Sequence, residues 1–179
     1  MFCLQRKYKF NWDLIGNMEI GRPNLGNTTR VEVYRLMQFA FCDVLEVKYG
    51  TEEADALFYV AGKLAGTEFY EEFLSGITDF KLFVSELQRL MKEMMVGILR
   101  IEEVDLEAQN LILTVAEDLD CSGLPELDYE VCKYYEGFIS GILECFTGKK
   151  YDVKEVDCWC TGDRTCRFRA RRVAESTSE

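Results

Sequence analysis

The spacing at which apolar residues recur changes near residue 96, and this change limits the possible folds more than any other feature. Before it, apolar side chains recur at helical spacing in three segments, at about 29–48, 51–74 and 79–95. After it, residues 96–104 and 110–117 alternate in character as the two strands of a hairpin do. The chain therefore starts as helices and continues as antiparallel strands.

The remaining segments extend the same pattern. We predict a fourth helix at about 128–146, two last strands at about 151–159 and 165–173, and a short strand within residues 3–12. The order is β-α-α-α-β-β-α-β-β, in which helices and strands do not alternate regularly. This order predicts an α+β fold with a helical layer packed on antiparallel hairpins.

Composition narrows the cellular setting. Hydrophobic residues make up 48% of the 179 residues, enough for a full core, and the formal net charge is −11. The acidic balance argues against binding to nucleic acid or to anionic membranes, which need a basic surface. Charges interrupt every apolar stretch before the ~20 residues of a membrane span, and the N-terminus lacks the pattern of a secretion signal. We therefore expect a cytoplasmic protein with no membrane span.

The chain has eight cysteines and no histidine. The missing histidine excludes Ser-His-Asp and Cys-His catalysis, zinc sites built on histidine and histidine-ligated haem. Cytoplasmic thiols stay reduced, so clustered cysteines favour a metal site over disulfides.

The cysteines concentrate near the C-terminus. Along a strand, Cys158 and Cys160 would face the same side, and a tight turn at 161–163 would bring Cys166 opposite Cys158. Cys132, near the start of the fourth helix, can approach from another direction. Zn²⁺ prefers such converging thiolates, and without histidine the acceptable sets are four cysteines or three cysteines and a glutamate. Buried thiols without a metal are the alternative.

Pairs of glycines recur in two of the helices. Gly62 and Gly66 in the second helix, like Gly137 and Gly141 in the fourth, are four residues apart and share a helix face. Such glycines allow either a close crossing of two helices or free space for a ligand. The first two helices are also apolar nearly all round, which indicates burial against a second subunit or around a cavity.

Several motifs together resemble a known family. They are Asp120-Cys121-Ser-Gly-Leu-Pro125, Val131-Cys132, Gly137-Phe-Ile-Ser-Gly141, Glu155-x-x-Cys158 and Gly162-Asp163-x-x-Cys166. In this arrangement they resemble the 4-vinyl reductase domain, a family that includes predicted hydrocarbon-binding proteins and the sensory modules of aromatic-responsive transcription activators. The resemblance extends over about residues 29–173.

The resemblance implies a fold related to the haem nitric-oxide-binding and Golgi vesicle-tethering domains, usually dimeric, with an apolar small-molecule pocket beside a structural zinc. Carried over by position, the zinc ligands are Cys132, Glu155, Cys158 and Cys166. Strict strand alternation would place Glu155 on the opposite face from Cys158, so this set requires a bulge at 156–157. Otherwise Cys160 replaces Glu155, and Cys121 remains a further candidate.

On this resemblance, we expect residues 1–28 to be an N-terminal strand and arm, 29–173 a 4-vinyl-reductase-like ligand-binding domain, and 174–179 a disordered tail. No dinucleotide-binding glycine motif is present, so we do not expect reductase activity in this chain. We expect a homodimer that buries part of residues 1–60, including the Gly16–Asn27 arm.

The expected function is binding of a small apolar molecule between the helical layer and the sheet. Candidate lining residues are bulky and uncharged: Phe39, Phe58, Phe69, Phe73, Phe83 and Leu87. The same side chains could instead fill the core of a dimeric adaptor protein. An accessory factor in tetrapyrrole vinyl reduction is a third possibility.

Overall fold

Helices and strands are segregated along the chain, as the change in spacing predicts. The computed structural model describes residues 8–105 and 107–174. Its elements are η1 (Trp12–Ile15), α1 (Met18–Gly21), α2 (Val31–Tyr49), α3 (Thr51–Phe73), α4 (Phe80–Glu93), β1 (Ile98–Asp105), β2 (Asn110–Ala116), α5 (Lys133–Thr147), β3 (Tyr151–Asp157), η2 (Trp159–Thr161) and β4 (Cys166–Arg172).

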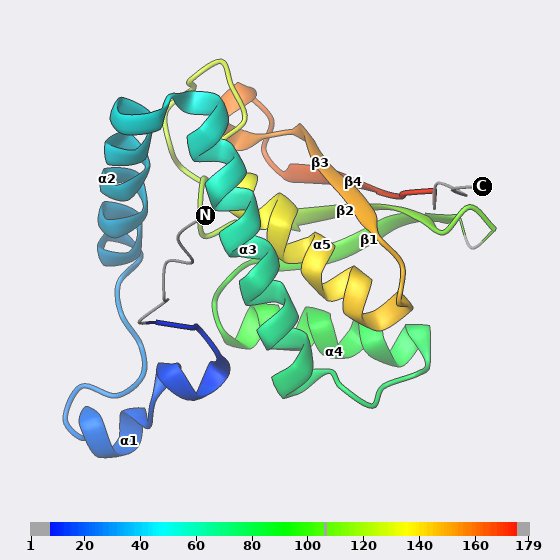
Figure 1. Ribbon diagram of the computed structural model, residues 1–179, viewed down its shortest axis with the longest axis horizontal. Coiled ribbons are helices and arrows are strands. Elements are labelled where there is room, and N and C mark those ends of the chain that lie inside the picture. The colour runs from blue at the N-terminus through cyan, green and yellow to red at the C-terminus, as the bar shows by residue number, and fades with distance from the viewer. Residues whose placement is uncertain (1–7, 106, 175–179) are drawn as a thin grey trace, which may run out of the picture.

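The four strands form one antiparallel sheet in the order β1-β2-β4-β3. Helix α5 lies between the sheet and α3, and α4 packs against β1 (Figure 1). Alternate residues of β4, namely Cys166, Phe168 and Ala170, are buried and face the helices. The fold is therefore the α+β arrangement of a helical layer on antiparallel strands that the sequence predicts.

The paired glycines allow a very close crossing of α3 and α5. A Cβ atom built at Gly62 would lie 1.9 Å from the Tyr134 carbonyl oxygen, and one built at Gly137 would lie 2.0 Å from the Tyr59 carbonyl oxygen. No side chain fits at such distances, so backbone packs directly against backbone. Of the two interpretations open from the sequence, the close crossing is correct.

Three local predictions differ from the structure. Of the predicted strand at 3–12, residues 3–7 lie outside the described residues, and residues 8–11 belong to no strand. Helix α2 begins after Arg30, with no side-chain cap, rather than at Thr28 or Thr29. Helix α5 begins only after Cys132, because residues 128–131 are extended or turning. The tail expected at 174–179 lies outside the described residues from position 175 onward.

Helix α2 is peripheral. Every residue of this helix is described, and none of them is buried. Its outward side carries large apolar residues, of which Leu36 is 74% and Val47 is 83% exposed. The helix stands at one side of the molecule, next to α3 (Figure 1). An apolar helix in this position leaves hydrophobic surface in contact with water.

Candidate functional site

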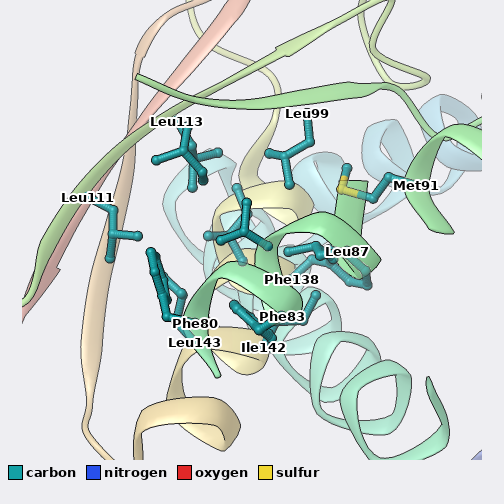
Figure 2. Close-up of a pocket in the computed structure, with 13 residues that line it drawn as sticks. Phe80, Phe83, Leu87, Met91, Leu99, Leu111, Leu113, Phe138, Ile142 and Leu143 are labelled. Carbon is teal, nitrogen blue, oxygen red and sulfur yellow. The ribbon is translucent and has the colours of Figure 1, made fainter. Parts of the chain in front are cut away.

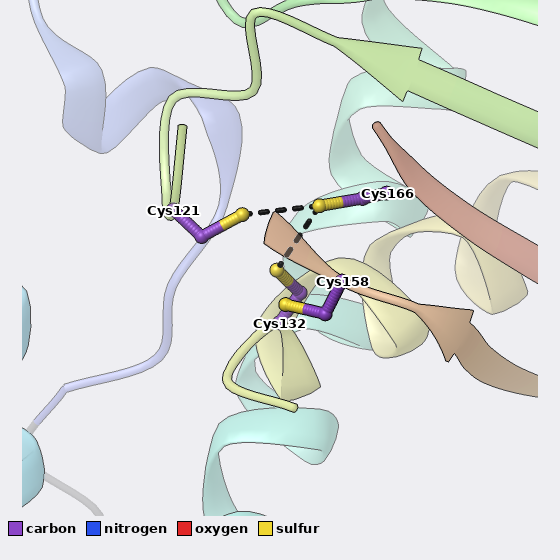
Figure 3. A group of neighbouring side chains, drawn as sticks. All are labelled: Cys121, Cys132, Cys158 and Cys166. Atoms are coloured by element: carbon purple, nitrogen blue, oxygen red, sulfur yellow. Dashed lines mark hydrogen bonds between the residues drawn. The ribbon is translucent and has the colours of Figure 1, made fainter. Parts of the chain in front are cut away.

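Four buried cysteines converge at one end of the sheet. The sulfur atoms of Cys121, Cys132, Cys158 and Cys166 all lie within 4.8 Å of one another (Figure 3). The Cys121 and Cys166 sulfurs are 3.0 Å apart, and those of Cys132 and Cys166 are 3.9 Å apart. Sulfurs bound to one tetrahedral zinc, each at ~2.3 Å, lie about 3.8 Å from one another. The cluster therefore fits a tetrahedral metal ion after shifts of about 1 Å or less.

Each thiol comes from a different part of the chain. Cys121 lies in the loop after β2, Cys132 precedes the first turn of α5, and Cys166 is the first residue of β4. Cys158 follows the end of β3 and precedes the short helix η2. The site consequently links the sheet, α5 and two loops, and it forms only when these elements are packed together.

Glu155 lies beside the thiols. The pairing of β3 with β4 shifts register between Glu155 and Asp157, which is the irregularity that the Glu155 assignment requires. Its Oε2 accepts a hydrogen bond of 3.3 Å from the backbone N–H of Cys132, while its Oε1 is buried and has no partner among the described residues. Burial raises the pKa of Glu155 to about 8.

A neighbouring carboxylate fixes the position of Glu155. The fully buried Glu136 of α5 accepts a 3.0 Å hydrogen bond from the backbone N–H of Glu155. The ammonium groups of Lys133 and Lys154 lie 3.2 and 3.3 Å from the Glu136 oxygens. Because its charge is paired, Glu136 can remain buried and connect β3 to the first turn of α5.

The thiols stabilise a negative charge within the cluster. Hydrogen bonds from its neighbours, Cys121 first, hold the pKa of Cys158 well below its ordinary value, whereas the equivalent contacts raise the pKa of Cys132. One thiolate surrounded by thiols is the state from which a soft cation displaces further protons. The donor chemistry suits zinc or another thiophilic metal.

Helix α2 holds the loop that supplies Cys121. The Arg35 guanidinium donates to the backbone carbonyls of Leu119, at 2.8 Å, and of Ser122, at 2.9 Å. The Tyr34 hydroxyl donates to the buried carboxylate of Asp120 at 2.7 Å. The sequence analysis did not predict these contacts, because 84 to 87 residues separate the partners.

The other cysteines lie apart from the cluster. Cys160 is buried in η2 and is not one of the four converging thiols. Strand β3 ends at Asp157, so the same-face relation expected for Cys158 and Cys160 along a strand is wrong. Cys42 and Cys145 are partly exposed, and Cys3 lies outside the described residues.

An apolar pocket lies between α4, α5 and the sheet (Figure 2). Its free space is about 20 Å³, close to the room that one water molecule requires. All thirteen described residues that line it are apolar: Phe80, Phe83, Val84, Leu87, Met91, Leu99, Ile101, Leu111, Leu113, Phe138, Ile139, Ile142 and Leu143. The sequence analysis missed the contribution of α5, although Phe138 and Ile142 are four residues apart and share one helix face.

The six predicted lining residues do not gather at one place. Phe83 and Leu87 line the pocket beneath α4, whereas Phe58 lies between α2 and α3. Phe39 faces a separate hollow near Leu127. Phe69 and Phe73 pack against each other and against Trp12, at ring-centre distances of 4.8 to 6.4 Å.

The fold and the cysteine site define a class of small α+β domain, and comparisons with known proteins identify it. Residues 111–172 match the model of the vinyl-4-reductase domain family. Over 156 residues the chain is 31% identical to the uncharacterized protein MJ1642 of Methanocaldococcus jannaschii, covering 87% of this chain and 85% of that protein. The chain belongs to the vinyl-4-reductase domain family.

Two solved structures share the fold. A vinyl-4-reductase family protein from Methanocaldococcus jannaschii has a TM-score of 0.60 and 17% identity, over 83% of this chain and 85% of that chain. The phenol-responsive sensory domain of the transcription activator PoxR, solved with phenol, also has a TM-score of 0.60, with 19% identity over 80% of this chain and 75% of that chain. Among the described residues of the present protein, no helix has the length and hydrophobicity needed to cross a membrane.

Proposed function

We propose that this chain is a small-molecule-binding domain whose ligand occupies the apolar pocket between α4, α5 and the sheet. The observation that carries the proposal is the pocket lining, which contains no polar or charged residue among those described. Such a lining selects a mostly apolar, uncharged molecule. The shared fold with a phenol-responsive sensory domain supports this assignment.

A ligand larger than water requires the walls of this pocket to move, because the free space is only about 20 Å³. Phe83 and Phe146 are stacked with ring centres 4.0 Å apart, and Phe80 lies beside both rings. Rotation of these aromatic side chains, or a small displacement of α4, would open the space. Binding would then be accompanied by a change in the position of α4 against β1.

The cysteine cluster would hold a structural zinc ion. Cys132, Cys158 and Cys166 are three of the ligands in this proposal, and the fourth is Cys121 or Glu155. Four protein ligands leave no coordination position for a reacting water, so the metal would stabilise rather than catalyse. It would connect α5, which lines the pocket, to the end of the sheet.

Two further parts of the proposal concern assembly and setting. A homodimer would cover the exposed apolar side of α2, with residues 1–28 acting as an arm and 29–173 as the ligand-binding unit. A cytoplasmic location would keep the four thiols reduced and available to metal.

Native mass spectrometry of the purified protein tests the proposal in one measurement, because it reports bound metal, retained ligand and subunit number together. We expect a dimer with one zinc per chain and additional mass from an apolar ligand, or uptake of an added uncharged aromatic such as naphthalene. Val84→Trp, which fills the pocket from α4, should abolish uptake, while Leu82→Trp on the exposed side of the same helix should not.

A second function is favoured by one observation, the small free volume of the pocket. If the core is simply filled, the domain acts as a dimeric adaptor that presents a surface to another protein. Uptake of no apolar probe by the wild type, together with an unchanged dimer, would favour this adaptor function over ligand binding.

A further inference from the structure

A hollow of about 430 Å³ lies between α2 and α3, and it shares no lining residue with the pocket beneath α4. It opens on the outer side of the helical layer, whereas the α4 pocket faces the sheet. Residues from three helices line it, among them Tyr34, Met37, Phe41, Phe58, Ala61 and Tyr134.

The two helices touch without interlocking. Phe41 of α2 and Phe58 of α3 meet edge to face, with ring centres 6.5 Å apart, yet no residue of α2 is buried. Packed helices normally insert the side chains of one into the grooves of the other and leave few voids. The space left here falls within the range of about 300 to 1,000 Å³ that small-molecule sites occupy.

The position of α2 is set by polar contacts at its first turns rather than by collapse onto α3. Arg35 and Tyr34 bind the loop at 118–122 through the Leu119 carbonyl and the Asp120 carboxylate. Because these contacts hold α2 at one end, the hollow is formed before a ligand arrives. A preformed site loses less free energy to ordering when it binds.

The chemistry of the lining selects the ligand. No charged residue lines the hollow among those described, and four of its nine lining residues are aromatic. Aromatic rings pack favourably edge to face or offset against one another. We propose that the hollow between α2 and α3 is a second ligand site, which binds an uncharged aromatic small molecule.

A second copy of the chain is a less suitable occupant of this hollow. The most exposed apolar residues of α2, Leu36 and Val47, do not line it and lie on a different side of the helix from Tyr34 and Leu45. A dimer partner would cover that outward side. The apolar residues all round α2 thus serve two surfaces, one toward a partner and one toward the hollow.

Titration with N-phenyl-1-naphthylamine, an uncharged aromatic whose fluorescence rises in apolar surroundings, tests the proposal. Ala61→Trp places a large side chain in the hollow from an exposed position on α3, and Leu57→Arg introduces a charge there. Ala56→Trp is the matched control, because Ala56 is exposed on the same helix and does not line the hollow. Circular dichroism and zinc content establish that each variant is folded.

We expect both hollow variants to weaken probe binding at least tenfold and Ala56→Trp to leave it unchanged. Wild-type affinity in Ala61→Trp and Leu57→Arg would overturn the proposal. So would loss of all binding in Val84→Trp alone, which would locate the probe beneath α4 and support the first site instead. If the wild type binds no probe and Ala61→Trp converts a dimer to a monomer, a second copy fills the hollow and the proposal is wrong.

Discussion

The backbone of Gly62 in α3 lies directly against the carbonyl of Tyr134 in α5, so closely that a Cβ atom at position 62 would be 1.9 Å from the carbonyl oxygen. Gly137 makes the equivalent approach to Tyr59 from the other helix. The two glycines therefore set the distance between the helix that borders the outer hollow and the helix that lines the inner pocket.

Alanine at either glycine should destabilise the protein. Gly62→Ala or Gly137→Ala forces the two helices apart, and overpacking of this kind costs typically ~1–3 kcal/mol, more than the ~1 kcal/mol that alanine gains in helix propensity. Urea unfolding at equilibrium measures the change. Gly21→Ala is the control, because a Cβ there meets no atom within 4 Å. Unchanged stability in both variants would contradict the close crossing.

Zinc content should identify the fourth metal ligand. We expect Cys132→Ser to lose bound zinc, and Cys121→Ser to lose it as well, because the Cys121 sulfur already lies among the other three. Glu155→Gln should retain zinc if Glu155 only accepts the Cys132 N–H hydrogen bond. Cys42→Ser, remote from the cluster, is the control. Loss of zinc from Glu155→Gln with full retention in Cys121→Ser would instead favour the ligand set that the family resemblance implies.

Removal of the metal should be visible in the fluorescence of Trp159. This residue follows Cys158, and its indole N–H donates to the Leu124 carbonyl at 2.9 Å, near the Cys121 loop. In a Trp12→Phe background it is the only tryptophan. We expect a strong chelator to shift its emission to longer wavelength and to lower the thermal unfolding temperature, because metal-binding energy here is folding energy. Emission and unfolding temperature that do not respond to the chelator would mean that no structural metal is bound.

The exposed side of α2 should control the oligomeric state. The double variant Leu36→Glu, Val44→Glu introduces charges among exposed apolar residues and should yield a monomer by light scattering at tens of micromolar. Leu82→Glu, equally polar but on the exposed side of α4, should leave the dimer intact. A wild type that is already monomeric at this concentration would refute the dimer.

The stability of the chelated protein should fall as pH rises. Burial, and next the nearby Asp120 carboxylate, raise the pKa of Asp118 to about 8, well above the ~4 of an unfolded aspartate. Between these values the folded state binds more protons than the unfolded state, so the free energy of unfolding decreases with increasing pH. Urea unfolding at pH 5 and pH 8 measures the difference, and Asp118→Asn should reduce it. An equal pH dependence in the variant would assign the effect to other groups.

The sequence determined the order of elements and the kind of donor atoms in the metal site. The change from helical to alternating spacing is a local property, so it predicted the α+β fold and most of the helix positions. The absence of histidine restricted the site to thiolates and carboxylates, and the motifs around Cys132, Cys158 and Cys166 identified three members of the cluster.

Tertiary packing decided what local patterns could not. Cys121 joins the cluster because the loop after β2 folds back between β4 and α2, a contact across 45 residues to Cys166. The bulge between Glu155 and Asp157 turns Glu155 toward the thiols. The apolar residues of α2, α3 and α4 look alike in the sequence, yet they divide among a core, an inner pocket and an outer hollow. That division depends on how close α3 and α5 approach and on the polar contacts of Arg35, and both join residues far apart in the chain.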